Sequence, residues 1–327
     1  MTALVAGFSA LGSLAACGVP ESAMDSPSGV SLTVDPAETE MSLESRLVQA
    51  GRLHTLTVCA TGCDYAEIQP AVEAAQSGDV VRVSRGTYSG PISVVQKSIV
   101  IRGDGPRQTT ISMGNPVIGF QCSPSVEVRI AGVTITNGGG RAGGVVNDGC
   151  ALTLRDVAVT QNAVHASGAG IQNSGTLLLS NCRLTDNLAR VAGGGLYNTA
   201  LGTAEIRDTT ISDNTAGITG GGGVLNEGNL VVRDSVFARN NGKHGGAFLN
   251  GGVLTIRDST LVENHAYLTG GAVYNEGTLW LRGSHVARNV ADIDGGGVQN
   301  EQGALVFFRD TSVRANVPDN CAGATCP

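Results

Sequence analysis

Two asparagines recur through the second half of the chain with a period of about 25 residues. A first asparagine ends a Gly-rich phrase, such as Gly-Gly-Ala-Phe-Leu-Asn at 245–250, and a second closes a phrase that runs from an apolar residue, as from Leu261 to Asn264. The first set is Asn147, Asn173, Asn198, Asn226, Asn250, Asn275 and Asn300, and the second is Asn162, Asn187, Asn214, Asn240, Asn264, Asn289 and Asn316. A fixed period of about 20 to 50 residues indicates stacked repeats, none of which buries its apolar face alone.

The phrase between the two asparagines predicts β-strands. Leu254, Ile256 and their equivalents place Val, Ile or Leu at alternate positions, which is typical of half-buried strands, while several glycines in each repeat disfavour helix. About 25 residues at roughly 3.3 Å each make one turn of a coil with two or three short strands. We therefore expect an all-β fold, a parallel β-helix of about ten coils, right-handed because parallel crossovers favour that hand.

The asparagines fit this geometry as structural residues. Stacked once per coil and turned inward at a bend, each amide can donate to the carboxamide of the next coil and form a ladder. The Gly-Gly pairs supply positive φ at tight corners. A phosphate-binding loop is excluded because the Gly-rich phrase recurs seven times and no helical pattern follows it.

The two repeated phrases, Gly-Gly-Ala/Gly-apolar-x-Asn and apolar-x-x-Asn, resemble those of the polymorphic outer-membrane-protein family, within the pectin-lyase-like group of right-handed β-helices. The resemblance covers about residues 119–317. It implies a surface protein associated with adhesion. Because many pectin-lyase-like β-helices are polysaccharide lyases or glycoside hydrolases, it also implies a carbohydrate-active enzyme as the alternative.

The segment before the repeats predicts an N-terminal cap. Ile68, Val72 and Ala75 lie on one face of an expected short helix at about 67–76, which would shield the first coil. The stretch from Ile68 through Gly86-Thr-Tyr88 resembles the opening segment of pectin-lyase-like β-helices. We therefore expect one continuous β-helix domain over 55–327.

The N-terminus predicts export and a lipid anchor. Residues 1–17 are small and apolar and end in Leu-Ala-Ala-Cys17, which resembles a bacterial lipoprotein signal, too short for a membrane span. A plain secretory signal stays open as the alternative, since no basic residue precedes the apolar stretch. Residues 18–54 have the composition of a disordered acidic tether. Gly18 after the cysteine implies an outer-membrane, extracytoplasmic location in the bacterial envelope.

The remaining cysteines predict disulfides. Close pairs near the two ends of an exported solenoid indicate staples that hold those ends, and zinc is a weaker alternative because no set of histidines accompanies them. The close pairs are Cys59 with Cys63 and Cys321 with Cys326, and a third pair one coil apart, able to bridge neighbouring coils, is Cys122 with Cys150. Cys182 takes the position that Ser259 has in its own coil, so we expect a buried free thiol.

The charge pattern excludes nucleic acid as a partner and predicts ordered columns. The net charge is −7 and only 4% of residues are aromatic, which disfavours binding to phosphate backbones and bases. One repeat position holds Arg155, Arg207, Arg233, Arg257, Arg282 and Arg309, and the next holds Asp156, Asp208, Asp234, Asp258 and Asp310. The signs also alternate before the second asparagines, in the order Asp213, Arg239, Glu263 and Arg288. We expect these charges to pair between coils.

The sequence assigns no catalytic residue, cofactor or metal ligand. The candidates for a carboxylate pair are Glu276 and Glu301, which follow ladder asparagines in adjacent coils, with Asp292 and Asp294 nearby. Glu227 occupies the same repeat position, which suits a solvated column, and the histidines have no metal-ligand spacing; they are His165, His244 and His265. We therefore expect a monomeric, non-catalytic envelope protein for adhesion or scaffolding, with a cell-surface polysaccharide or protein as partner and contact with the membrane through the lipid alone.

Overall fold

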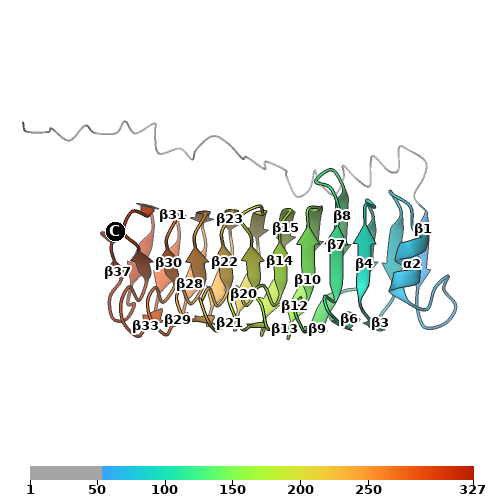
Figure 1. The fold of residues 1–327 in the computed structure, drawn as a ribbon, viewed down its shortest axis with the longest axis horizontal. Coiled ribbons are helices and arrows are strands. Elements are labelled where there is room, and N and C mark those ends of the chain that lie inside the picture. The colour runs from blue at the N-terminus through green and yellow to red at the C-terminus, as the bar shows by residue number, and fades with distance from the viewer. Residues whose placement is uncertain (1–53) are drawn as a thin grey trace, which may run out of the picture. The chain divides into compact units, whose positions relative to one another are not determined.

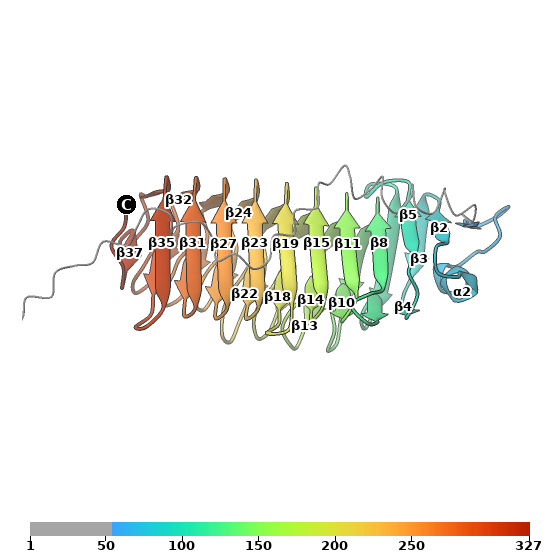
Figure 2. The same ribbon diagram turned by 90° about the horizontal axis from the view of Figure 1, so that it is seen from above.

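Residues 54–327, which a computed structural model describes, form a parallel β-solenoid (Figures 1 and 2). Cys17, the expected signal peptide and all but the last residue of the expected tether lie outside the described residues. Every strand pairing within residues 54–327 is parallel, and each strand pairs with its equivalents one coil before and after it. The largest sheet of this part has eleven strands, so the solenoid has about eleven coils, one more than we expected.

Four sheets run along the stack, and we name them A to D. Sheet A contains β1 (Thr55–Val58), β2 (Val80–Val83), β5 (Val100–Gly103), β8 (Glu127–Ala131), β11 (Ala151–Arg155), β15 (Thr176–Ser180), β19 (Thr203–Arg207), β23 (Asn229–Arg233), β27 (Val253–Arg257), β31 (Thr278–Arg282) and β35 (Leu305–Arg309). Sheet B contains β3 (Gly86–Ser89), β6 (Thr109–Gly114), β9 (Thr134–Gly138), β12 (Ala158–Thr160), β16 (Arg183–Thr185), β20 (Thr210–Ser212), β24 (Val236–Ala238), β28 (Thr260–Val262), β32 (His285–Ala287) and β36 (Ser312–Arg314).

The other two sheets complete each coil. Sheet C contains β4 (Ile92–Val95), β7 (Ile118–Gln121), β10 (Val145–Asp148), β14 (Ile171–Asn173), β18 (Leu196–Asn198), β22 (Val224–Asn226), β26 (Phe248–Asn250), β30 (Val273–Asn275), β34 (Val298–Asn300) and β37 (Cys321–Ala322). The short sheet D contains β13 (Ala163–Val164), β17 (Leu188–Ala189), β21 (Thr215–Ala216), β25 (Asn241–Gly242), β29 (His265–Ala266) and β33 (Val290–Ala291).

The core lies inside the coil, where alternate residues of each strand point. In β27, Leu254 and Ile256 are buried while the residues between and beside them face outward, as the alternation predicts. Phe237 of β24 and Phe248 of β26 meet across the interior with ring centroids 4.4 Å apart. Because every coil contributes similar apolar side chains, one continuous core runs along the stack.

The N-terminal end is capped by α2 (Ile68–Ala74), the one helix in residues 54–327. Its buried side chains, Ile68, Ala71 and Val72, pack into the core as the sequence predicts. Lys97 caps the C-terminal end of the helix, because its Nζ donates to the carbonyl oxygens of Val72 and Glu73 at 2.9 and 2.7 Å. The helix therefore shields the first coils from solvent and edge pairing.

All three expected disulfides are confirmed. Cys59 pairs with Cys63 near the N-terminal end, and Cys321 of β37 pairs with Cys326 at the C-terminal end. A third bond, Cys122 with Cys150, joins β7 to β10 across neighbouring coils, with the two Cα atoms 4.8 Å apart. Each bond restrains the unfolded chain and so favours the folded coil it closes.

The first asparagine set forms an unbroken ladder at the end of the sheet C strands. Each Nδ2 donates to the Oδ1 of the next asparagine toward the C-terminus at 2.7 to 2.9 Å, from Asn147 through to Asn300. The same Nδ2 atoms also donate to backbone carbonyls of the bend, as Asn250 does to Gly252 and Thr278. Six of the seven side chains are fully buried, so the ladder satisfies polar groups that water does not reach.

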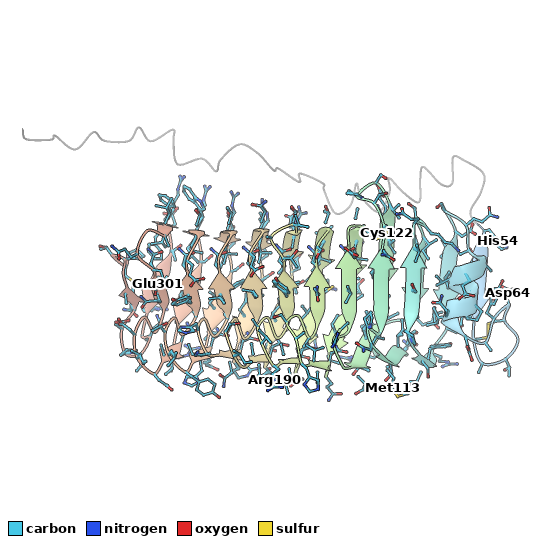
Figure 3. The ribbon with its side chains drawn as sticks, viewed as in Figure 1. His54, Asp64, Met113, Cys122, Arg190 and Glu301 are labelled. Carbon is cyan, nitrogen blue, oxygen red and sulfur yellow. A yellow bond between two sulfur atoms is a disulfide. The ribbon has the colours of Figure 1, made fainter. Side chains whose placement is uncertain are left out.

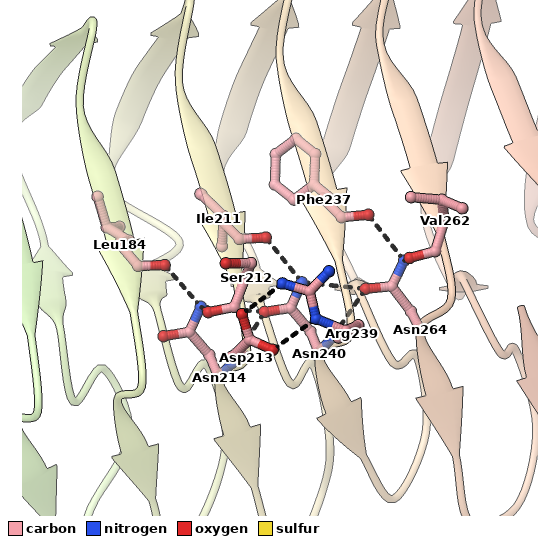
Figure 4. A network of polar contacts seen from close by, with 10 residues as sticks. All are labelled: Leu184, Ile211, Ser212, Asp213, Asn214, Phe237, Arg239, Asn240, Val262 and Asn264. Carbon is pink, nitrogen blue, oxygen red and sulfur yellow. Dashed lines mark hydrogen bonds and ion pairs between the residues drawn. The ribbon is translucent and has the colours of Figure 1, made fainter.

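The second set forms a parallel ladder at the bend after sheet B (Figure 4). From Asn187 onward each Oδ1 accepts two hydrogen bonds from the preceding asparagine; Asn240 Oδ1, for example, accepts from the Nδ2 and the backbone N–H of Asn214 at 3.0 and 3.1 Å. Each Nδ2 also donates back to a carbonyl of the preceding coil, as Asn240 does to Ile211 at 2.9 Å. At the C-terminal end, Asn320 accepts both hydrogen bonds from Asn316 and so terminates the ladder.

A third ladder, which the sequence analysis did not foresee, explains Cys182. Buried hydroxyls stack between sheets A and B, and each accepts the backbone N–H of the preceding coil while donating to a carbonyl two residues back; they belong to Thr209, Ser235, Ser259 and Ser284. Cys182 precedes Thr209 in this column, and its thiol donates to the carbonyl oxygens of Leu154 and Ser180 at 3.3 Å. The thiol is free and buried as expected, and burial raises its pKa to about 12.

The aspartate column has a conformational cause. Asp156, Asp208, Asp234, Asp258 and Asp310 all have φ between 48° and 51°, in the left-handed region that Asp, Asn and Gly tolerate best. Gly132, Asn181 and Gly283 fill the same turn in three further coils, with φ of 66°, 51° and 59°. The sequence analysis assigned these aspartates to charge pairing alone. The structure shows that the turn between sheets A and B requires a residue that tolerates the left-handed conformation.

We predict that Asn250→Ala destabilises the folded protein by about 1–3 kcal/mol, because it removes the ladder acceptor of Asn226 Nδ2 and leaves the buried Oδ1 of Asn275 without its donor. The matched control is Asn229→Ala, which removes an exposed asparagine at the start of β23. Denaturant unfolding of both variants measures the effect. Equal stability of the two variants would contradict a structural role for the ladder.

Candidate functional site

The outward face of sheet A presents the expected arginine column, most of whose charge is paired. In the register of the sheet, Arg207, Arg233, Arg257, Arg282 and Arg309 lie on consecutive coils. The buried Glu205 forms ion pairs with the first two, at 2.7 Å from Arg207 Nε and 3.3 Å from Arg233 Nε. Arg309 lies 3.6 Å from the carboxylate of Asp310. The pKa of Arg257 is lowered by desolvation and by the neighbouring guanidinium groups. These contacts balance charge along the stack.

The alternating charges before the second asparagines also pair between coils. Arg239 makes two hydrogen bonds to the carboxylate of Asp213, each at 2.8 Å (Figure 4). Arg288 Nε lies 3.3 Å from Glu263 Oε1. The bonds from Arg239 hold the pKa of Asp213 below its usual range. The ion pairs of this column fix the register of neighbouring coils at the surface of the bend. Its charges are therefore already paired within the protein.

The outward face of sheet C carries a different column, which we call the tyrosine–leucine column. It consists of the middle residues of six successive strands, which are Gln172, Tyr197, Leu225, Leu249, Tyr274 and Gln299. Leu225 and Leu249 pack with Ala192 in an apolar cluster outside the main core, and the rings of Tyr197 and Tyr274 pack against it. The order of side chains is therefore amide, aromatic, two aliphatic, aromatic, amide.

Glycines before each strand border this column on one side. Gly270, with φ of +72°, is required there because a Cβ would lie 2.6 Å from the Val273 carbonyl oxygen. Gly193, Gly221 and Gly295 have the same conformation in their own coils. The chain thus turns tightly into every sheet C strand, which sets the outward tyrosines and leucines in register.

Glutamates border the other side, and two of them hold the tyrosines. Tyr197 Oη donates to Glu227 Oε2 at 2.7 Å, one coil further on. Tyr274 makes the same bond to Glu301, whose position near the C-terminal end Figure 3 shows. Desolvation is the largest cause of a raised pKa at both tyrosines, and the bonded carboxylate is the second. Together they raise the pKa of Tyr197 to about 12 and also raise that of Tyr274. Both tyrosines are therefore neutral donors at any physiological pH.

The two candidate carboxylates do lie together at this column. Desolvation by its surroundings and the nearby charge of Glu301 raise the pKa of Glu276 above its usual value. His244 completes the group, with its ring centroid 4.8 Å from that of Tyr274 and its Nδ1 2.9 Å from Thr269 Oγ1. Burial lowers the pKa of His244, so the imidazole is neutral at neutral pH.

The other candidates lie apart from this group. His265 Nε2 lies 2.8 Å from Asp292 Oδ1, and His165 is exposed. Desolvation, and to a smaller extent a hydrogen bond to Asp294, raise the pKa of Asp319. Among residues 54–327 no group of three or more His, Cys, Asp or Glu side chains is placed to hold a metal ion.

The pairing of Tyr197 and Tyr274 with glutamates was missed at the sequence level, although a signal exists. In Gly-Gly-Gly-Leu-Tyr-Asn and Gly-Gly-Ala-Val-Tyr-Asn the tyrosine precedes a ladder asparagine, and in the next coil a glutamate follows the equivalent asparagine. Reading the two coils as stacked strands brings those positions side by side. The repeat period alone does not reveal the bond, because it crosses from one coil to the next.

We predict that the stability difference between Glu276→Gln and the wild type depends on pH. A raised folded-state pKa means that this carboxyl stabilises the fold below its unfolded value, near 4.5, and loses that contribution as pH rises through the folded value. The variant cannot ionise, so its melting temperature should rise relative to that of the wild type as the pH increases from the unfolded value through the folded one. Glu127→Gln, at an exposed position of β8, is the matched control. A difference that stays constant with pH would contradict the assignment.

Comparison with known proteins gives the family. The model of the right-handed β-helix region matches residues 118–291, and no curated protein matches the chain. Among solved structures, the pectate lyase Pel9A is 14% identical over 84% of this chain and 80% of that one, with a TM-score of 0.51. A pectin methylesterase from Aspergillus niger is 12% identical over 84% and 93%, with a TM-score of 0.48. The likeness to the pectate lyase shows the fold alone. The match over more than half of its length places the chain in the right-handed β-helix family.

Proposed function

We propose that this protein is a non-catalytic lipoprotein of the bacterial cell envelope whose solenoid binds an extended polymer for adhesion or scaffolding. One observation carries the proposal: equivalent outward side chains stand in register from coil to coil, as in the arginine column of sheet A and the tyrosine–leucine column of sheet C. A column of this sort offers a repeating surface along the stack, which suits a repeating ligand. Solenoids of other repeat families use extended faces for binding in the same way.

The carboxylates of sheet C support binding better than catalysis. Glu227 and Glu301 each accept a hydrogen bond from a tyrosine of the preceding coil, so the same pair occurs twice along the face. A catalytic centre brings unlike groups together at one place. The tyrosine–glutamate pair recurs three coils away, so it is a repeated feature of the surface and not a single centre.

The envelope location rests on the sequence and on the disulfides. Residues 1–17 resemble a lipoprotein signal that ends at Cys17, and this segment supplies the proposed anchor. Three disulfides among residues 59–326 are typical of a protein that folds outside the reducing cytoplasm. Within residues 54–327, no helix has the length and apolar character needed to cross a membrane.

A carbohydrate-active enzyme is the second candidate, and one observation favours it. Glu276 has a raised pKa beside Glu301, and Tyr274 and His244 lie at the same place. A pair of carboxyl groups in which the acid has a raised pKa is the arrangement that glycoside hydrolysis requires. Glu276 would act as the acid and Glu301 as the second carboxyl group.

We predict that the purified protein binds at least one polysaccharide of a broad panel and cleaves none, with or without calcium. Retention in affinity electrophoresis measures binding, and the appearance of reducing ends or unsaturated products measures cleavage. Glu276→Gln and Glu301→Gln are the variants for the second candidate. Cleavage that either substitution abolishes would overturn the non-catalytic function and establish the enzyme.

We also predict that Cys17 becomes the lipid-modified first residue of the mature protein. Processing in cells should stop when globomycin is added, and mass spectrometry of the mature N-terminus should show the acyl chains. The matched control is Cys17→Ser, which should be released as soluble protein. A mature protein with an unmodified Cys17 would remove the anchor from the proposal.

A further inference from the structure

The N-terminal edge of sheet A is closed by the protein itself. On the side of β1 that faces away from β2, the N–H of Thr57 donates to Asp64 Oδ2 at 2.9 Å, and its carbonyl oxygen accepts from the N–H of Tyr65 at 3.0 Å. The inward side chains of β1, Leu56 and Val58, are buried. This edge therefore offers another strand neither backbone groups nor an uncovered core.

The C-terminal edge of sheet A has no such closure. Among residues 54–327, β35 is the last strand of the sheet and pairs only with β31 (Figure 2). In that ladder the N–H of Leu305 donates to Gly277, and the carbonyl oxygen of Arg309 accepts from Gly283. Alternate residues of a parallel strand bond to opposite neighbours, so Val306 and Phe308 turn their N–H and C=O groups toward the open edge.

The core is also uncovered beside β35. The inward side chains of this strand, Val306 and Phe308, are only half-buried, whereas their equivalents in β31, Leu279 and Leu281, are buried. The disulfide loop 321–326 packs against the same core from the side of sheet C. It does not complete the burial of the two β35 side chains, so the end of the core needs a further apolar cover.

The outward side chains of β35 add to this apolar edge. Leu305 and Phe307 are 53% and 38% exposed, and the ring of Phe307 stacks on that of Trp280 with centroids 4.0 Å apart. Exposed edge strands are usually protected by a charge, a proline or a bulge, and the first four residues of β35, Leu-Val-Phe-Phe, contain neither charge nor proline. The strand has the composition of one that is paired on both sides.

We propose that two copies of this chain associate through their C-terminal ends, with the two β35 strands paired antiparallel about a two-fold axis at Phe307. The inference goes beyond the proposed function and does not depend on it. Because the β1 edge is closed, a head-to-tail stack has no matching edge, whereas a second β35 presents the same free groups. The dimer replaces the monomer expected from the sequence, which does not reveal which edge is closed.

The side chains of β35 are complementary to themselves in this register. Val306 pairs with Phe308 of the second copy, so the free backbone groups of both copies bond and each uncovered core end covers the other. Phe307 faces its own equivalent in a non-hydrogen-bonded pair, where side chains lie closest, and this joins two Trp280–Phe307 stacks. The two Arg309 side chains lie roughly 13 Å apart, four residues along the strand, so like charges do not face each other.

The first test measures association by sedimentation velocity over a series of concentrations. The protein is the full chain with Cys17→Ser, so that a lipid anchor does not cause association. The mass should double as the concentration rises. Phe307→Glu and Phe307→Lys each place like charges opposite one another and should weaken association at least about tenfold, whereas an equimolar mixture of the two should form a heterodimer. Leu201→Glu, at a position that is 83% exposed and distant in sequence from β35, is the matched control.

A second variant separates pairing from folding. Val306→Pro removes an N–H that points to the open edge and takes no part in the β31 ladder, a position at which edge strands accept proline. It should lose the dimer and keep the circular dichroism spectrum of the wild type. Dimerisation that the charge variants abolish and their mixture restores supports the inference. A monomer at every concentration, assembly beyond a dimer, or association that Phe307→Glu and Val306→Pro both leave unchanged overturns it. Where melting shows that a Phe307 variant is unfolded, Val306→Pro decides.

Discussion

The hydrogen-bonded asparagine ladders are the interaction on which the rest of this structure depends. Each carboxamide both donates and accepts along the stack, so a shift of one coil against the next would break two ladders at once. The hydroxyl ladder adds a third line of bonds at another corner. Apolar packing alone tolerates slippage between similar coils, whereas buried amides without partners do not. The ladders therefore determine the register, and the register determines what the surface presents.

The surface follows from that register. Once the coils are fixed, side chains at equivalent repeat positions stand in columns with the spacing of the coils. Charged columns use this spacing to pair with one another, as Arg239 and Asp213 do. The tyrosine–leucine column instead leaves aromatic, aliphatic and amide groups in order along one face. Regularity that stabilises the fold thus also produces a repeating surface, which is why a polymer is the natural ligand to propose.

The sequence predicts the fold closely because the decisive contacts recur at a fixed period. The strands, the capping helix, the three disulfides and the free thiol of Cys182 follow from residues whose roles depend on their place within one coil. Contacts between coils were predicted less well. The Tyr197–Glu227 bond and the Thr209 hydroxyl bonds need the register of neighbouring coils, and coil lengths vary. The aspartate turns were assigned to charge because a left-handed backbone and a charged column favour the same residue.

The candidate carboxylates illustrate the same limit. Sequence position places Glu276 and Glu301 in adjacent coils, and the structure adds the tyrosine and histidine beside them. Their spacing along a regular stack would arise with or without a ligand. What distinguishes the column is the combination of two hydrogen-bonded tyrosines with the buried leucines packed between them, and no single repeat contains both.

A crystal structure of the protein with an oligosaccharide from a polymer that it binds tests the account most directly. The account predicts that the bound chain crosses several coils on a face whose side chains stand in register. A chain held within a single coil would contradict it.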